Sequence, residues 1–294
     1  KNTFSKNLKN NELFFSILCV LILVIKFNRL SEFGYDYVSQ FILLVVFHKV
    51  YFLNFSKHEI IKALMYFVLS VLIKPVSLLF FPILLFIFFK KRFLFVKEIS
   101  LSKYFVMFLL LATLFSSSFA KTGCVFYPIN SSCFSNEKVF WSEKDKLKQY
   151  SRTIELWAKS FDVQRRSNNE KINDTNLYLQ NFNWLKFWIE HHFFYKIFEF
   201  LLIVLTLTIL IYLYCSKLII KLDNDKKDRQ FMFVLSILSI LFWLNTVPQF
   251  RFGFSAIIIF LFFLFSFFLN LNIKFNKKKI KYLIIFGLLV LNLK

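Results

Sequence analysis

Residues 120–134, AKTGCVFYPINSSCF, open the one long hydrophilic stretch of this chain, which runs to residue 196. On either side of it, four apolar runs with at most one or two charges each occupy residues 101–119, 197–215, 231–247 and 253–271. About 20 apolar residues in a helix cross the roughly 30 Å hydrocarbon core of a bilayer, so these runs predict membrane spans. The sequence therefore predicts a helical membrane protein that is interrupted by one polar segment, 120–196.

Five shorter apolar runs leave the number of spans open. They lie at 13–25, 40–55, 60–73, 75–89 and 282–293, and runs of this length can also be re-entrant or interfacial. Counting all of them, we expect an all-α polytopic fold of about nine transmembrane or re-entrant helices. About five fall in residues 1–119 and about four in residues 197–294, on either side of the polar segment.

The boundary at Lys74-Pro75 allows two interpretations. Proline removes a backbone donor and disfavours helical geometry in the residue before it, so 60–89 is either a hairpin of two short helices or one kinked helix. The hairpin fits the charge distribution better, because a single span would turn Lys57 and Lys62 to the outer side.

The formal charge of +21 is concentrated in short loops between the apolar runs, at 90–97, 216–229 and 274–281. Such loops fall on one side if the helices alternate, and the positive-inside rule makes that side cytoplasmic. This pattern argues against a nucleic-acid partner. It predicts a multi-pass protein of a bacterial inner membrane with the polar segment in the periplasm.

Two parts of the polar segment are expected to be helices that lie on the membrane surface. Residues 145–161 place apolar side chains at steps of three and four, at Leu147, Tyr150, Ile154, Trp157 and Phe161. Residues 177–194, LYLQNFNWLKFWIEHHFF, are dense in aromatic residues, which favour the headgroup region. Between them, 163–176 is polar and predicts a flexible loop tip.

Two cysteines of the polar segment, Cys124 and Cys133, are candidates for a disulfide. An oxidising exterior favours the pairing, and closing a loop of about ten residues would contribute about 2.5 to 3 kcal/mol in the chain-entropy model. The alternatives are two free thiols or part of a metal site, which would need further ligands. Adjacent His191 and His192 point to different sides of a helix, which favours structural roles, and we assign no metal site.

The charged residues expected on the outer face are the candidate site. Glu32 and Asp36 could act as a general base or hold Mg²⁺ or Mn²⁺ beside a phosphate leaving group, although Asp36 could equally cap a helix. Lys74 and Arg251 could bind a lipid-linked phosphate, or they could extend to ordinary headgroups. A cation kept near the bilayer calls for a partner.

Five strings in this order resemble an uncharacterised family of bacterial multi-pass membrane proteins, which is similar to the GT-C superfamily of integral membrane glycosyltransferases. They are RLSEFGYD (29–36), IKPVSLL (73–79), TGCVFYPINSSCF (122–134), TIELWAKSF (153–161) and PQFRFGFSA (248–256). The resemblance implies transfer of a sugar from a polyprenyl-phosphate donor to a glycan or lipid acceptor of the cell envelope, on the periplasmic face. Lys74 and Arg251 match basic positions that face the lipid phosphate, and Asp36 is similar to a secondary acidic site.

The principal acidic residue of that superfamily lies in the first outer loop, which here would precede Lys1. Because the chain starts at Lys rather than Met and its last apolar run stops at Lys294, we expect a fragment of a longer protein that lacks its N-terminal part. The competing hypothesis is a non-catalytic membrane protein, either a flippase-like transporter or a scaffold in envelope polysaccharide assembly.

Overall fold

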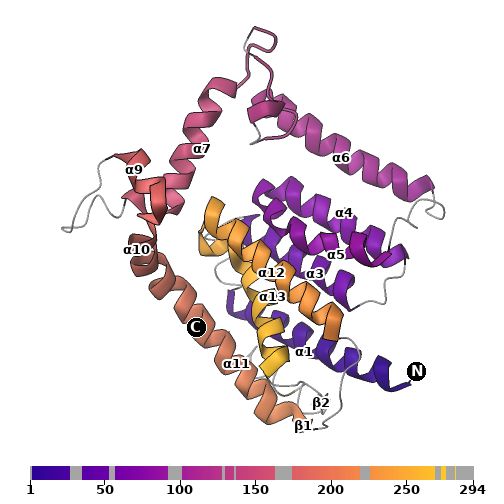
Figure 1. Cartoon of the computed structure of the whole chain (residues 1–294). Helices are drawn as coiled ribbons and strands as arrows, with labels where there is room; N and C mark the ends of the chain where they lie inside the picture. Colours follow the sequence, from indigo (N-terminus) through magenta and orange to yellow (C-terminus); the bar gives the residue numbers. More distant parts are fainter. Residues whose placement is uncertain are drawn as a thin grey trace.

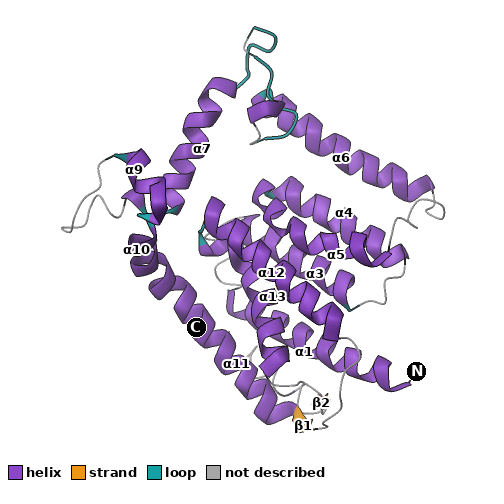
Figure 2. Cartoon of the chain, viewed as in Figure 1, coloured by secondary structure: helices purple, strands orange, loops and turns teal. Residues whose placement is uncertain are grey.

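The structure is a computed structural model of the chain, and the regular secondary structure of its described part is helical apart from one pair of three-residue strands (Figures 1 and 2). The residues that it describes are 2–26, 35–52, 57–91, 101–127, 130–135, 137–162, 174–218, 226–268, 273–275 and 282. The longer helices are α1 (Asn2–Lys26), α3 (Tyr35–Tyr51), α4 (Lys57–Ile73), α5 (Phe81–Lys91), α6 (Leu101–Thr122), α7 (Lys144–Ala158), α11 (Glu199–Cys215), α12 (Lys226–Thr246) and α13 (Phe250–Phe268).

Short elements connect these helices. They are the 3-10 helices η2 (Pro75–Phe80), η3 (Asn130–Ser132) and η4 (Gln180–Phe182), the short helices α9 (Thr175–Leu179) and α10 (Leu185–Trp188), the π-helix η5 (Ile189–Phe198), and the antiparallel strands β1 (Ser216–Leu218) and β2 (Ile273–Phe275). The helical fold class that the sequence predicts is confirmed at this level.

Three helical stretches are long and apolar enough to cross a membrane: Tyr104–Thr122, Leu185–Ile211 and Lys227–Thr246. They coincide with three of the four long apolar runs in the sequence. The fourth run falls in α13, where Phe250–Ser266 is a shorter apolar helix, as are Asn11–Val24 and Pro75–Phe86. The last predicted run, 282–293, lies outside the described residues except for Tyr282.

The helix that contains the second of these stretches starts earlier than the sequence predicts. The aromatic surface helix expected at 177–194 and the span expected at 197–215 are joined, because α10, η5 and α11 follow one another without a break from Leu185 to Cys215. The ten residues of η5 are in the π-helical conformation, which is rare and usually limited to a single turn. Apolar and aromatic side chains continue through this stretch, so composition alone does not mark a boundary there.

A core rich in phenylalanine holds α1, α3 and α13 together. Phe15 lies edge-to-face on Phe47 and Phe262, with ring centroids 4.9 Å and 5.2 Å apart, and Phe47 meets Phe263 at 5.6 Å. Such pairs contribute about 0.5 to 1.5 kcal/mol each beyond the area that they bury. The Phe-rich runs of the sequence are therefore more than lipid-facing surface, because part of them forms the interior.

At Lys74 the backbone breaks between α4 and η2, where the sequence places the Lys74-Pro75 boundary. Lys74 is extended, with φ −148° and ψ 110°, between the end of α4 and the start of η2. The Ser77 hydroxyl donates to the carbonyl oxygen of Ser70 at 3.3 Å. Residues seven apart in a straight helix are separated by about 10 Å along the axis, so this contact shows that α4 does not continue straight through Lys74.

Close packing between α12 and α13 fixes the turn between them. A Cβ on Gly253 would lie 2.4 Å from an indole carbon of Trp243, so only glycine fits at this crossing. The indole Nε1 of Trp243 donates to the carbonyl oxygen of Gln249 at 2.9 Å. The first turn of α13 is thereby held in place, and this turn carries Arg251.

Two lysines at one end of the α3–α4 pair share a carboxylate. Lys49 and Lys62 contact the two oxygens of Glu59 at 2.6 Å and 3.0 Å. Hydrogen bonds from Lys49 and then Lys62 lower the pKa of Glu59 to about 2. Glu59 precedes the apolar run of α4 and lies away from the candidate site.

Candidate functional site

Asp36, Lys74 and Arg251, which the sequence singles out separately, meet in one ion cluster. The Lys74 ammonium lies 2.7 Å from Oδ1 of Asp36, and Nε of Arg251 lies 3.2 Å from Oδ2. They come from the first turn of α3, the break between α4 and η2, and the first turn of α13. We call these three residues the ion cluster.

Burial differs sharply between the members of the ion cluster. Asp36 is only 3% exposed, whereas the side chains of Lys74 and Arg251 are 36% and 27% exposed. A buried carboxylate is costly unless it is paired, and here each of its oxygens faces a cation. The carboxylate therefore positions the two cations, each of which keeps part of its side chain accessible.

One helical turn further along, a buried hydrogen-bonded pair fixes the spacing between α3 and α13. The hydroxyl and the backbone N–H of Ser255 both donate to Oε1 of Gln40, at 2.7 Å and 3.1 Å. Gln40 lies four residues after Asp36, and Ser255 lies four residues after Arg251. Because residues four apart lie on one face of a helix, this bond holds the two charged residues opposite each other.

The end of α7 covers the Arg251 side of the ion cluster. The guanidinium of Arg251 lies over the rings of Trp157 and Phe252, 5.1 Å and 4.9 Å from their centroids. The amide of Gln249 donates to the carbonyl oxygen of Ala158 at 3.2 Å, and it lies 3.1 Å from Nε2 of the buried His192. The polar segment 120–196 thus contacts the site through α7.

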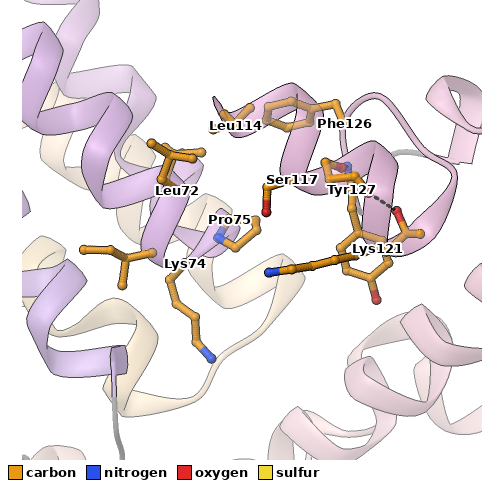
Figure 3. Close-up of a pocket in the computed structure, with 12 residues that line it drawn as sticks. Leu72, Lys74, Pro75, Leu114, Ser117, Lys121, Phe126 and Tyr127 are labelled. Atoms are coloured by element: carbon orange, nitrogen blue, oxygen red, sulfur yellow. Dashed lines mark hydrogen bonds between the residues drawn. The ribbon is translucent and has the colours of Figure 1, made fainter. Parts of the chain in front are cut away.

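A pocket of about 330 Å³ lies on the Lys74 side of the ion cluster, between the α4–η2 turn and the end of α6 (Figure 3). Half of its lining is aliphatic or aromatic, from Val71, Leu72, Ile73, Pro75, Leu114 and Phe126. The other half carries ammonium, hydroxyl or phenol groups, from Lys74, Ser117, Ser118, Lys121, Thr122 and Tyr127. Of the described residues that line this pocket, none is acidic.

Lys121 contributes a second cation to the pocket. Figure 3 shows its side chain extending toward Pro75, with the Ser117 hydroxyl directed into the same space. Lys121 is in the last turn of α6, where the unpaired carbonyl groups of a helix end favour a positive side chain. Two lysine side chains in the lining of a pocket with an apolar wall suit a ligand with an anionic head and a hydrocarbon tail.

A disulfide-closed loop forms the Tyr127 wall of the pocket. Cys124 and Cys133 are joined by an S–S bond of 2.07 Å, and Leu147 of α7 packs against them. The Ser118 hydroxyl donates to the carbonyl oxygen of Cys124 and accepts from the backbone N–H of Tyr127, both at 2.8 Å. The loop is therefore fastened to α6 at the pocket.

Burial and two neighbouring side chains change the pKa of the Tyr127 phenol. Burial, and then the nearby Glu143 and Tyr150, raise the pKa of Tyr127 above its ordinary value. The phenol is therefore a neutral hydrogen-bond donor at physiological pH. Tyr150 belongs to α7, so this effect also indicates that α7 passes close to the pocket wall.

A divalent cation does not fit the described part of this site. The described residues contain no group of three His, Cys, Asp or Glu side chains that could hold a metal ion. Mg²⁺ and Ca²⁺ take several oxygen ligands, whereas both oxygens of Asp36 already face cations. Glu32, the other predicted carboxylate, lies outside the described residues.

Sequence reasoning missed the contributions of Lys121, Tyr127 and Trp157 to this site. Lys121 directly follows a long apolar run and precedes the first cysteine of the loop, which is a usable signal for a cation at a membrane edge. Trp157 belongs to the apolar stripe of 145–161, but no local pattern indicates that it would lie against Arg251. That contact depends on how α7 is placed.

The fold and site define a helical protein with stretches long enough to cross a membrane, an ion cluster at helix ends and an amphipathic pocket beside it. Residues 1–258 match the family described as a domain of unknown function, DUF8201, and the chain belongs to this family. No curated protein and no solved structure matches the chain.

Proposed function

We propose that the chain is a membrane glycosyltransferase of the GT-C type, which transfers a sugar from a polyprenyl-phosphate donor to a cell-envelope acceptor. The pocket of Lys74 and Lys121 is the observation that carries this proposal. Its apolar wall suits the first isoprene units of the lipid, and its two ammonium groups suit the phosphate. Hydroxyl groups of Ser117 and Tyr127 can add hydrogen bonds to phosphate oxygens.

The proposed reaction uses these cations to stabilise a leaving group. The acceptor hydroxyl oxygen bonds to the anomeric carbon, the bond from that carbon to the phosphate oxygen breaks, and the phosphate keeps the electron pair and takes up the acceptor proton. Lys74 and Lys121 would stabilise the charge that develops on the phosphate, as preorganised cations do in other transferases. Asp36 holds Lys74 and Arg251 in place, and no step is assigned to a metal.

The membrane arrangement in this proposal follows the charge pattern of the sequence. About nine transmembrane or re-entrant helices would place the basic loops in the cytoplasm and the polar segment 120–196 in the periplasm of a bacterial inner membrane. The exposed surface of α6 supports its contact with lipid, since Phe105 and Phe108 are 59% and 65% exposed. The ion cluster would then lie at the periplasmic edge of the bilayer.

Transfer can be tested with membranes that contain the full-length protein. They are incubated with radiolabelled polyprenyl-phosphate sugars, and label in lipid or glycan acceptors is measured. We expect transfer in the wild type and about 10- to 150-fold less in Lys121→Ala, since a hydrogen bond to a charged group contributes about 1.5 to 3 kcal/mol. Lys138→Ala, an exposed lysine outside the pocket, is the matched control. Absence of transfer in the wild type would sink the proposal.

A non-catalytic membrane protein, either a flippase-like transporter or a scaffold, is the second candidate. It is favoured by one observation: the described lining of the pocket offers no carboxylate to serve as a base, and Asp36 is engaged with two cations. A transporter would bind the lipid phosphate and lose this binding in Lys121→Ala without transferring a sugar. A scaffold would bind neither lipid nor sugar at this pocket.

A further inference from the structure

We propose that one face of α7, formed by Tyr150, Ile154 and Trp157, binds the sugar ring of the lipid-linked donor whose phosphate lies in the pocket. We call these three residues the α7 platform. This inference rests on the proposed function, because it takes the pocket as the phosphate site. It assigns the sugar to the polar segment 120–196 and the lipid phosphate to the helices around Lys74.

The α7 platform is an apolar surface that the fold leaves uncovered. Its residues follow one another at steps of four and three, so they share one face of the helix. Tyr150, Ile154 and Trp157 are 47%, 45% and 40% exposed. Large apolar side chains that stay exposed together at a site mark a surface that takes a ligand or a partner.

Both ends of this same face are attached to the candidate site. One turn before the platform, Leu147 is 1% exposed and packs against the Cys124–Cys133 disulfide beside Tyr127. At the other end, Trp157 lies against Arg251. Leu147 and Trp157 are ten residues apart, or about 15 Å along the helix. The platform therefore extends from the pocket wall to the ion cluster, and its middle remains open.

The direction in which the α7 platform faces indicates whether it contacts a lipid bilayer or a ligand of the candidate site. A helix that rests on a bilayer turns its apolar face to the headgroups. Here the ends of the apolar face contact the disulfide loop and Arg251, so the face is turned toward the rest of the chain. Figure 1 shows that α7 runs between the end of α6 and the α9–α10 region.

The cations near the α7 platform indicate which ligand it binds. A phosphate held by Lys74 and Lys121 carries the lipid on one oxygen and the sugar on another, and the apolar pocket wall takes the lipid. A sugar ring has a face of C–H groups that packs on an aromatic ring by dispersion, and hydroxyls at its rim for polar neighbours. Arg251 is such a neighbour, next to the exposed part of Trp157.

The experiment compares lipid phosphates with and without a sugar on the purified full chain in detergent. Dissociation constants are measured for farnesyl phosphate and for its glucose and mannose esters. We expect the wild type to bind at least one ester more tightly than farnesyl phosphate. Tyr150→Ala should weaken ester binding about three- to tenfold, the range for an aromatic stacking contact, and leave farnesyl phosphate binding unchanged.

The outcomes separate the platform from the phosphate pocket. Trp141→Ala, which removes an indole of similar exposure that packs on Phe119, is the matched control and should bind all three ligands normally. Equal loss of ester and farnesyl phosphate binding in Tyr150→Ala, which removes a side chain at the far end of the platform from Arg251, would overturn the sugar assignment. Equal wild-type affinity for esters and farnesyl phosphate would do the same. A wild type that binds none of the ligands would instead refute the phosphate pocket itself.

Discussion

Replacing Asp36 by Asn tests whether the buried carboxylate organises the ion cluster. At an effective dielectric constant of about 20, cations at 2.7 Å and 3.2 Å from its oxygens contribute about 6 and about 5 kcal/mol of attraction. Desolvation of Asp36 offsets much of this gain. Removing one partner of a buried ion pair nevertheless costs about 3 to 5 kcal/mol, because the remaining charge loses its compensation. We expect a loss in the lower part of that range, since Lys74 and Arg251 can still turn toward water.

Thermal unfolding of the purified chain, followed by tryptophan fluorescence, measures this loss. The melting temperature of Asp36→Asn should lie roughly 5 to 15 °C below that of the wild type. Asp162→Asn, which changes an exposed aspartate, should have the melting temperature of the wild type. The double variant Asp36→Asn with Arg251→Gln removes the repulsion between the two remaining cations. It should cost about 1 to 3 kcal/mol less than the sum of the single variants.

Two results would refute this reasoning. An Asp36→Asn variant as stable as the wild type would mean that the carboxylate does not compensate the two cations. Strict additivity in the double variant would mean that Asp36 and Arg251 do not interact, although 3.2 Å separates their charged atoms.

Three further predictions concern other parts of the fold. Gly253→Ala should lower stability by about 1 to 3 kcal/mol through overpacking against Trp243, and a melting temperature equal to that of the wild type would contradict the tight helix crossing. Replacing Cys124 and Cys133 together by Ser should lower the free energy of unfolding by about 2.5 to 3 kcal/mol; denaturant titrations that coincide with those of the wild type would rule this out. The lowered pKa of Glu59 gives stability that is complete above about pH 4.5 and lost as the pH falls toward 2. Glu59→Gln should therefore flatten the acid limb of a melting-temperature profile, and an unchanged limb would count against the pairing.

Most helices of the fold can be predicted from the sequence, because long apolar runs have few alternatives to a helix. The break at Lys74-Pro75 is also predictable, since proline restricts the residue before it. The predicted boundary near residue 196 falls inside one continuous helical stretch. Aromatic residues suit both an interfacial helix and a membrane span, so the helix from Leu185 to Cys215 continues where the sequence predicts a change.

The candidate site is predictable only in part. Asp36, Lys74 and Arg251 stand out in the sequence as charged residues at the edges of apolar runs, because a charge near a bilayer is costly without a partner. Their contact is not predictable, since 38 and 177 residues separate Asp36–Lys74 and Lys74–Arg251 in the chain. The role of Lys121 in the pocket likewise depends on how α6 lies beside the α4–η2 turn.

The sequence by itself determined a helical, membrane-type chain with one polar segment, because hydrophobic length and charge are local properties that need no partner. The cysteine pair and the apolar stripe of the polar segment that begins at residue 120 are also recognisable from the sequence alone. Only the tertiary structure decided what these features face. The stripe turns toward Arg251 and the disulfide loop, and a single carboxylate holds two cations from distant helices, because a buried charge must find its partner across the packed fold.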